Sequence, residues 1–212
     1  MKINDVTIPL TEATPVWEGE EGIFIQRSSE IGAKSEYNVS RIALGLHSGT
    51  HMDAPFHVQQ AGKTVDAIPL ERLIGSAQVV EIPTFSKVID RLLLEGLKID
   101  TSIKRILFKT KNSNYWNDNP AKFTRDYVAL DSSGAMFLKS AGMELVGIDF
   151  FSISTFNDLL TPHKILLQND VVVIENLDLR AVCAGIYQLF CLPLKVFGTD
   201  GAPVRVVLVS DQ

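Results

Sequence analysis

The segment His47-Ser48-Gly49-Thr50-His51-Met52-Asp53-Ala54-Pro55-Phe56-His57 holds three of the four histidines in this 212-residue chain, together with an aspartate. His47 and His51 are four residues apart, a spacing that places two metal ligands on one face of a helix. Gly49 and Pro55 disfavour a continuous helix here, so we expect a loop that follows a strand. In such a loop, Gly49 lets the backbone turn tightly enough for His47, His51 and Asp53 to converge.

This combination of side chains is typical of a metal site. Neutral imidazole nitrogens suit zinc and other first-row ions, and a carboxylate can bridge two of them. Three ligands leave room for a water, whose pKa a bound ion can lower to about 7. Single histidines more often serve as surface or hydrogen-bonded core residues. A catalytic triad that uses Ser48 or Thr50 is a further alternative, but the chain has no Gly-x-Ser-x-Gly elbow.

The composition favours one ordinary globular domain spanning residues 1–212. Hydrophobic residues make up 46% of the chain and charged residues 21%. A net charge of −5 provides no basic stripe, so we expect no nucleic-acid partner. No apolar run approaches the roughly 20 residues of a spanning helix, and the N-terminus lacks a signal-peptide pattern, so we expect a cytoplasmic protein with no membrane partner. Cys183 and Cys191 have neither metal-finger nor redox spacing.

Hydrophobic periodicity predicts a strand-rich α/β fold. We expect helices over residues 86–96, with Ser86 as the N-cap, over 131–142 beginning at Asp131, and over 162–168. Residues 111–119 have the composition of an exposed loop. The expected strands are 3–10, 23–25, 38–46, 77–82, 105–109, 145–150, 171–175, 187–192 and 204–209.

The segment 47–57 also matches the pattern His-x-Gly-Thr-His-x-Asp-x-Pro-x-His at every specified position. This pattern is the signature of the cyclase-like metal hydrolases, a family that includes bacterial kynurenine formamidases. The chain resembles the family along most of its length, and the resemblance implies a swivelling β/β/α fold. Further matches are Thr14-Pro15-Val16-Trp17, Asn38-Val39-Ser40-Arg41, Gly147-Ile148-Asp149 and Leu192-Pro193-Leu194-Lys195.

The resemblance also implies a role for each residue of the signature. The two histidines His47 and His51 would bind one ion, and Asp53 would bridge two ions. His57 would act as general acid and base. The family uses a downstream histidine on the second ion and a bridging glutamate twelve residues later, a spacing found here in His163 and Glu175. Without the resemblance, His163 would be read as a polar residue on a helix and Glu175 as a carboxylate at a strand end.

The implied reaction is hydrolysis of an amide-type C–N bond in a small aryl substrate by metal-activated water. An arylformamidase of the N-formylkynurenine type, which acts in tryptophan catabolism, fits best. It would use two divalent ions, zinc or alternatively manganese. Trp17 corresponds to a substrate-contacting tryptophan of the family, and Phe150, Phe151 and Phe156 are weaker candidates for the same contact. Members of the family form at least homodimers, so we expect a homo-oligomer.

Two other functions stay open at this point. Phe150-Phe151-Ser152-Ile153 stands where formamidases of the family tend to carry a Thr-Pro-Ser stretch, so the wall of the pocket is bulkier and more apolar. A ring-opening amidohydrolase similar to isatin hydrolase, using manganese, is therefore one alternative. The other is a protein that binds a metal or a small molecule without useful catalysis.

Overall fold

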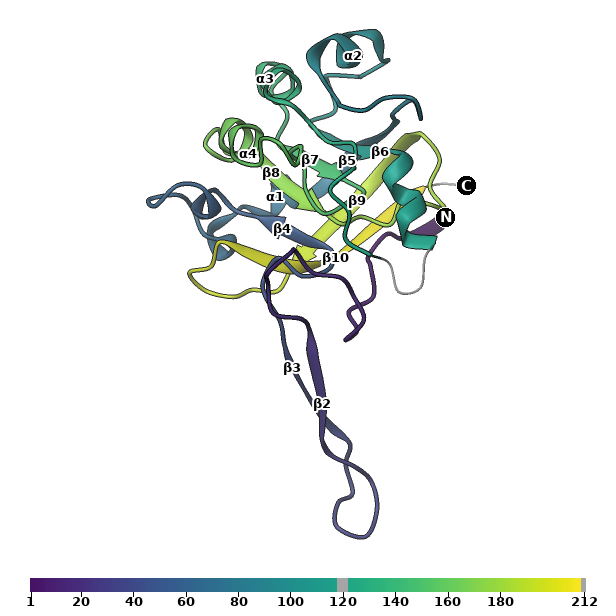
Figure 1. Cartoon of the computed structure of the whole chain (residues 1–212), viewed down its shortest axis with the longest axis vertical. Helices are drawn as coiled ribbons and strands as arrows, with labels where there is room; N and C mark the ends of the chain where they lie inside the picture. Colours follow the sequence, from purple (N-terminus) through teal and green to yellow (C-terminus); the bar gives the residue numbers. More distant parts are fainter. Residues whose placement is uncertain (118–121, 211–212) are drawn as a thin grey trace.

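The computed structural model describes residues 1–117 and 122–210, which form a mixed α/β body from which one hairpin projects (Figure 1). Strands of the body pair in the order β1-β10-β4-β8-β7-β6-β5-β9. Because β9 also pairs with β10, seven of these strands close into a barrel, and β1 pairs with the far half of β10. The strands are β1 (Lys2–Asp5), β4 (His51–Asp53), β5 (Ile74–Glu81), β6 (Arg105–Lys109), β7 (Leu145–Ile148), β8 (Val172–Glu175), β9 (Gly185–Pro193) and β10 (Gly201–Ser210).

Strands β5 to β8 run parallel, whereas all other pairs are antiparallel. The parallel strands are short apolar runs, and β7 and β8 are buried along their whole length. Such strands need cover on both faces. In β6, Phe108 packs in the core that the helices share, and its neighbour Leu107 packs in a second core. Since side chains alternate along a strand, the second core is the interior of the barrel.

In the described ranges, 1–117 and 122–210, four α-helices and three 3-10 helices connect the strands. α1 (Leu70–Leu73) is a single turn, and α3 and α4 pack against each other beside the barrel (Figure 1). The combination of these helices with the mixed sheet confirms the predicted α/β class. The description of the fold as swivelling β/β/α stays a prediction. The remaining helices are α2 (Arg91–Gly96), α3 (Ser132–Ser140), α4 (Leu160–Leu167), and the 3-10 helices η1 (Pro55–His57), η2 (Val65–Ala67) and η3 (Lys111–Asn117).

The two predicted helix starts have different outcomes. The start predicted at Asp131 is correct, since Asp131 directly precedes α3 and its carboxylate accepts a hydrogen bond from the Gly134 N–H at 2.8 Å. The predicted cap Ser86 is wrong, since α2 begins after Asp90, whose carboxylate accepts from the Leu93 N–H at 2.7 Å. Asp90 lies four residues further on and is an equally good N-cap residue.

Two predicted loops are also wrong. Residues 51–53 form strand β4 rather than a loop. Residues 111–117 form η3, in which Asn112 and Trp116 are buried. Asn112 Nδ2 donates to the Val128 carbonyl at 2.7 Å, and Trp116 Nε1 donates to the Asp149 carbonyl at 2.9 Å. These tertiary hydrogen bonds draw a polar segment inward. Residues 118 and 119 of the predicted loop lie outside the described residues.

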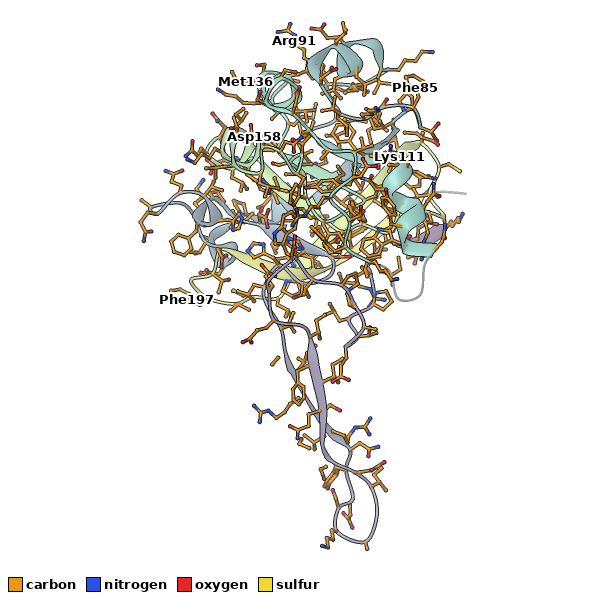
Figure 2. The ribbon with its side chains drawn as sticks, in the orientation of Figure 1. Phe85, Arg91, Lys111, Met136, Asp158 and Phe197 are labelled. Atoms are coloured by element: carbon orange, nitrogen blue, oxygen red, sulfur yellow. The ribbon has the colours of Figure 1, made fainter. Side chains whose placement is uncertain are left out.

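The projecting hairpin consists of β2 (Phe24–Ser29) and β3 (Val39–Ala43), and we call residues 24–43 the arm. Figure 1 shows it extending well away from the barrel, and Figure 2 shows its side chains surrounded by open space. An isolated two-stranded hairpin is only marginally stable in water. The arm nevertheless exposes the large apolar side chains of Phe24, Ile25, Ile31, Tyr37, Val39 and Ile42.

Across the described ranges, 1–117 and 122–210, no helix has both the length and the apolar character needed to cross a membrane.

Candidate metal centre

Strand pairing brings the first ligating groups together. In the antiparallel pair β4 and β8, His51 lies opposite Glu175 and Met52 lies opposite Ile174. Since side chains alternate along a strand, His51 and Asp53 share one face while Met52 points the other way, into the barrel core. The register of one strand pair therefore places an imidazole and two carboxylates on the same surface.

The two carboxylates both lie between His51 and His163. Asp53 Oδ1 lies 3.5 Å from His51 Nε2, and Asp53 Oδ2 lies 3.5 Å from His163 Nε2. Glu175 Oε2 lies 3.3 Å from His51 Nε2, and Glu175 Oε1 lies 3.1 Å from His163 Nε2. All four side chains are buried. The arrangement has the form of two carboxylates that span a pair of imidazoles.

His47 and His57 complete the cluster on its outer side. His47 Nδ1 lies 2.8 Å from Asp53 Oδ1, and its Nε2 lies 2.8 Å from Asp200 Oδ2. The ring centroids of His47 and His57 are 4.4 Å apart, and His57 Nδ1 is 3.5 Å from Asp200 Oδ2. His57 is the most exposed of the four histidines, with 35% of its side-chain surface accessible. It therefore lies nearer to solvent than the buried carboxylates.

Backbone and hydroxyl groups orient the buried rings. His51 Nδ1 donates to the carbonyl of Gly49 at 2.9 Å. His163 Nδ1 lies 2.6 Å from Ser154 Oγ and 2.7 Å from the carbonyl of Leu159. A proton on Nδ1 leaves the Nε2 lone pair of each ring directed at the carboxylates, which is the usual arrangement of metal-binding histidines. Gly49 itself has a φ of 62°, where other residues are strained.

The electrostatics of the cluster favour bound positive charge. Burial alone lowers the pKa of His47, but hydrogen bonds and charge interactions with Asp53 and Asp200 raise it to about 10. Burial likewise lowers the pKa of His163, and Asp53 and Glu175 raise it to about 10. Burial raises the pKa of the Asp53 carboxyl, but the histidines around it hold that pKa well below the ordinary value. Protons on these rings offset the buried carboxylate charge, and a metal cation could do the same.

The residues present fit a metal ion. His51 Nε2 and both carboxylate oxygens of Asp53 are buried and have no hydrogen-bond partner of acceptable geometry among residues 1–117 and 122–210. Ligating atoms within 4.8 Å of one another form two groups that share Asp53: His47, Asp53 and His57 in one, and His51, Asp53 and Glu175 in the other. His163 Nε2 adjoins the second group through both carboxylates. Unpartnered polar atoms that face one another are the signature of a cation site.

The geometry does not support the alternative of a serine or threonine nucleophile. Thr50 Oγ1 donates to the Asn176 carbonyl at 2.6 Å and accepts from the Ile8 N–H at 2.8 Å, so it has a structural role. Ser48 Oγ is buried and has no hydrogen bond to a histidine within the described residues. A triad needs a nucleophile bonded to its base, and neither hydroxyl meets that requirement.

A cavity of about 270 Å³ opens onto the cluster. The five predicted metal-binding residues line this cavity, and so do His57 and Trp17. The structure therefore brings all seven predicted site residues to one place. Trp17 packs edge-on against Phe123 at 5.0 Å and stacks on Phe156 at 6.1 Å. Of the weaker aromatic candidates, Phe151 lines the cavity, whereas Phe150 is fully buried in the helix-side core. The roles of these residues stay predictions.

Sequence reasoning missed three residues at this site. Asp200 contacts His47 and His57, Ser154 contacts His163, and Glu20 lines the cavity. None belongs to a histidine motif, and each reaches the site through the tertiary fold. Only Asp200 has a recognisable signal in the sequence, because it directly precedes Gly201 at the start of an apolar strand. A Cβ added at Gly201 would lie 2.7 Å from His47 Cε1, so the glycine makes room for that ring.

Three comparisons with known proteins agree with this geometry. Residues 4–155 match the Cyclase family, whose description is "Putative cyclase". Cyclase-like protein 3 of Oryza sativa subsp. japonica is 37% identical, over 99% of this chain and 80% of its own length. Kynurenine formamidase of Salinibacter ruber (strain DSM 13855 / M31) is 33% identical, over 98% of this chain and 97% of its own.

A solved structure titled "The Structure Of Potential Metal-Dependent Hydrolase With Cyclase Activity" is also similar, with a TM-score of 0.84 and 33% identity. The match covers 98% of this chain and 96% of the other, so the barrel, the helices and the site are compared as a whole. The family match spans well over half of the chain, and the relatives exceed 30% identity along nearly all of it. This protein therefore belongs to the Cyclase family.

Proposed function

We propose that this protein is a metal-dependent hydrolase that cleaves the amide-type C–N bond of a small aryl substrate, as an arylformamidase of the N-formylkynurenine type. The observation that carries the proposal is the buried pair Asp53 and Glu175, each with one oxygen beside His51 and the other beside His163. Carboxylates that span imidazoles suit a pair of divalent ions. Similarity to the kynurenine formamidase of Salinibacter ruber and to the solved potential metal-dependent hydrolase supports the same reaction class.

In this proposal the metal ligands are His47, His51, Asp53, His163 and Glu175, and they hold two divalent ions. Imidazole and carboxylate ligands suit zinc and also manganese, of which we propose zinc. A divalent ion held by these residues would polarise the scissile carbonyl and lower the pKa of a water. The N–H of Ile153 donates to Glu175 Oε1 at 2.6 Å and so fixes the orientation of that carboxylate.

His57 is the proposed general acid and base. Its position at the exposed side of the cluster lets it meet both the attacking water and the leaving group. It takes a proton from the water and returns it to the leaving nitrogen, so that the aryl amine departs as a neutral molecule. Asp200, 3.5 Å from His57 Nδ1, would keep the proton on that nitrogen and leave Nε2 for the transfer.

The cavity walls limit the substrate. Val58, Phe151, Leu159 and Leu160 line the cavity beside the ligands and exclude water from the reacting bond. A volume of about 270 Å³ is slightly below the roughly 300–1,000 Å³ typical of ligand sites. The cavity therefore suits a substrate with one aromatic ring, which would pack on Trp17.

A hydrolysis screen tests the proposal. The protein is stripped of metal with a chelator, reloaded with zinc or manganese, and assayed with N-formylkynurenine, simple aryl formamides and isatin. We expect release of formate from the aryl formamides that depends on the added metal. Metal content is measured on the same samples, so that failure to load is distinguished from failure to react.

The alternatives predict different outcomes of this screen. Opening of isatin without turnover of any formamide would support a ring-opening amidohydrolase. No turnover at full metal occupancy would support a metal-binding or small-molecule-binding protein without catalysis. Either result would overturn the arylformamidase proposal.

We further propose that the protein is a homo-oligomer, of at least two copies, in which the arm packs against another copy. Ile25 and Ile42 lie opposite each other on one face of the hairpin, and Phe24 lies on the other face. All three are exposed on a hairpin that has little cover from its own barrel. Light scattering after size exclusion should give at least twice the 23.4 kDa chain mass. Replacing Phe24, Ile25 and Ile42 together with serine should yield monomers, and an unchanged mass would contradict this role of the arm.

A further inference from the structure

Trp17 and Glu20 lie on one turn at the mouth of the cavity. The Glu20 N–H donates to the Trp17 carbonyl at 3.0 Å, and both side chains line the cavity. Glu20 is exposed, whereas Asp53, His163 and Glu175 at the other end of the cavity are buried. The turn therefore holds an aromatic ring and a carboxylate together at the outer end of the substrate site.

The carboxylate of Glu20 is uncompensated, unlike that of its neighbour Glu18. Arg125 forms an ion pair with Glu18 at 2.5 Å and lies 4.8 Å from the ring centroid of Phe156. Glu20 has no side-chain hydrogen bond or ion pair with any residue in ranges 1–117 and 122–210. Gly45 is its neighbour, and a Cβ added there would be in ordinary contact with Glu20 Oε2, at 3.7 Å. The free carboxylate is thus available to a ligand in the cavity.

The cavity is electrically asymmetric. Its lining residues, as far as the chain is described, include no lysine and no arginine. The inner end carries the proposed metal ligands, which would attract the carbonyl oxygen of a substrate when loaded. The apolar residues Val58, Phe151, Leu159 and Leu160 also line the cavity and offer no partner for a charge. A positive group on the substrate would find a partner only in the Glu20 carboxylate at the mouth. A negative group would find no positively charged partner at the mouth.

We propose that the preferred substrates carry a protonated amine on a side chain remote from the scissile amide, and that Glu20 and Trp17 bind it. This inference rests on the proposed function and narrows its substrate class. A carboxylate attracts an ammonium group directly, and the face of a tryptophan ring adds a cation–π interaction. Together these contacts, at a partly exposed site, correspond to a preference of about tenfold over a neutral side chain.

The proposal has a specific consequence for N-formylkynurenine. Its side chain carries an ammonium group and a carboxylate on the same carbon, so the carboxylate would come close to Glu20. Repulsion between the substrate carboxylate and the Glu20 carboxylate opposes binding. We therefore expect the corresponding ring with an aminoalkyl chain and no carboxylate to be the better substrate.

The test compares three aryl formamides with the same ring and side chains of equal length that end in methyl, ammonium or carboxylate. With the metal-loaded wild-type protein, kcat/KM should be about tenfold higher for the ammonium compound than for the methyl compound, and lowest for the carboxylate. Glu20→Gln should abolish the preference for ammonium, and Glu20→Lys should shift the preference toward the carboxylate. Equal kcat/KM for all three compounds with the wild type would overturn the proposal.

Glu21→Gln is the matched control, because Glu21 is the next residue and does not line this cavity. It should keep the wild-type ratio of ammonium to methyl substrate. A change in that ratio as large as that of Glu20→Gln would mean that general surface charge, not a subsite, sets the preference, and would also overturn the proposal.

A binding measurement separates this inference from the reaction class. 2-Phenylethylamine and its neutral analogue propylbenzene are titrated into the metal-loaded wild type and Glu20→Gln protein. The amine should bind about tenfold more tightly to the wild type, and Glu20→Gln should remove the difference. That result with no formamide turnover would leave the subsite standing and overturn the arylformamidase. Turnover of formamides without any charge preference, in kinetics or in binding, would support the arylformamidase and overturn the subsite.

Discussion

Asp200 Oδ2 lies 2.8 Å from His47 Nε2, while the other nitrogen of the same ring lies 2.8 Å from Asp53 Oδ1. The ring is held between a buried and a half-exposed carboxylate. Because Asp200 fixes the proton on Nε2, it would present the Nδ1 lone pair to an ion beside Asp53. Outer carboxylates of this kind typically contribute ten- to a hundredfold to metal affinity.

Asp200→Asn should therefore weaken metal binding by about ten- to a hundredfold without unfolding the protein. Titration of the stripped protein with zinc, in competition with a chromogenic chelator, measures the change. Asp126→Asn is a suitable control, since the Asp126 side chain is exposed and lies outside the cavity. If both variants bind zinc as the wild type does, Asp200 does not orient His47.

The proposed acid/base role of His57 makes a different prediction from a ligand role. His57→Ala should lower kcat by about 10²–10⁴-fold and retain nearly all of the metal, because His57 transfers a proton. Asp53→Ala and Glu175→Ala should lose metal, because each removes a carboxylate that spans two histidines. Metal analysis and turnover are measured on the same preparations. Equal metal loss in all three variants would make His57 a ligand, as its position beside His47 and Asp53 also permits.

Gly201 provides a steric test of the His47 position. A Cβ at Gly201 would lie 2.7 Å from His47 Cε1 and 3.0 Å from its Nε2, so Gly201→Ala should displace the ring. We expect weaker metal binding with a small change in the melting temperature of the stripped protein. Gly96→Ala is the matched control, since no atom lies within 4 Å of its added Cβ. Undisturbed metal affinity in Gly201→Ala would show that His47 is free to move or does not bind the ion.

The pKa values of His47 and His163 predict how stability depends on pH. Burial lowers both pKa values, but nearby carboxylates raise them to about 10. Asp53 and Asp200 act on His47, and Asp53 and Glu175 act on His163. A group whose pKa is raised on folding stabilises the protein below its unfolded value of about 6.5, and that contribution is lost as pH rises through the folded value. Chelator-treated protein should thus lose thermal stability between about pH 6.5 and pH 10.

Metal should reverse this trend, because bound ions replace those protons and compete with them less as pH rises. The increase in melting temperature caused by zinc should grow over the same pH range. Differential scanning fluorimetry of stripped and loaded samples measures both curves. A stripped protein whose stability rises with pH would contradict protonation of the two rings in the absence of metal.

The sequence alone predicted the parts of the structure that local chemistry determines. Asp131 caps α3 because its carboxylate serves the first turn of the helix, and the apolar runs of β6 to β8 form buried parallel strands. The family resemblance carried by the histidine signature indicated six side chains, with His163 and Glu175 among them, that the fold does bring to one cavity. These predictions depend on residue type and spacing, which are visible in the sequence.

Tertiary contacts determined the features that could not be predicted. The polar segment 111–117 is drawn inward because Asn112 bonds to Val128 and Trp116 bonds to Asp149. Asp200 and Glu20 reach the site from opposite ends of the chain, with no motif to link them to the histidines. Barrel closure through the pairing of β9 with β10 likewise joins strands whose partners no local pattern specifies.

The short pairing of β4 with β8 ties assembly of the site to correct folding. A slip of one residue would place Met52 opposite Glu175 and turn His51 and Asp53 into the barrel interior. A chain trapped in that arrangement would have no ligand set and could gain nothing from the ion. Metal binding would therefore favour correctly folded molecules, because the ion stabilises only those in which the three-residue strand β4 has the correct register with β8.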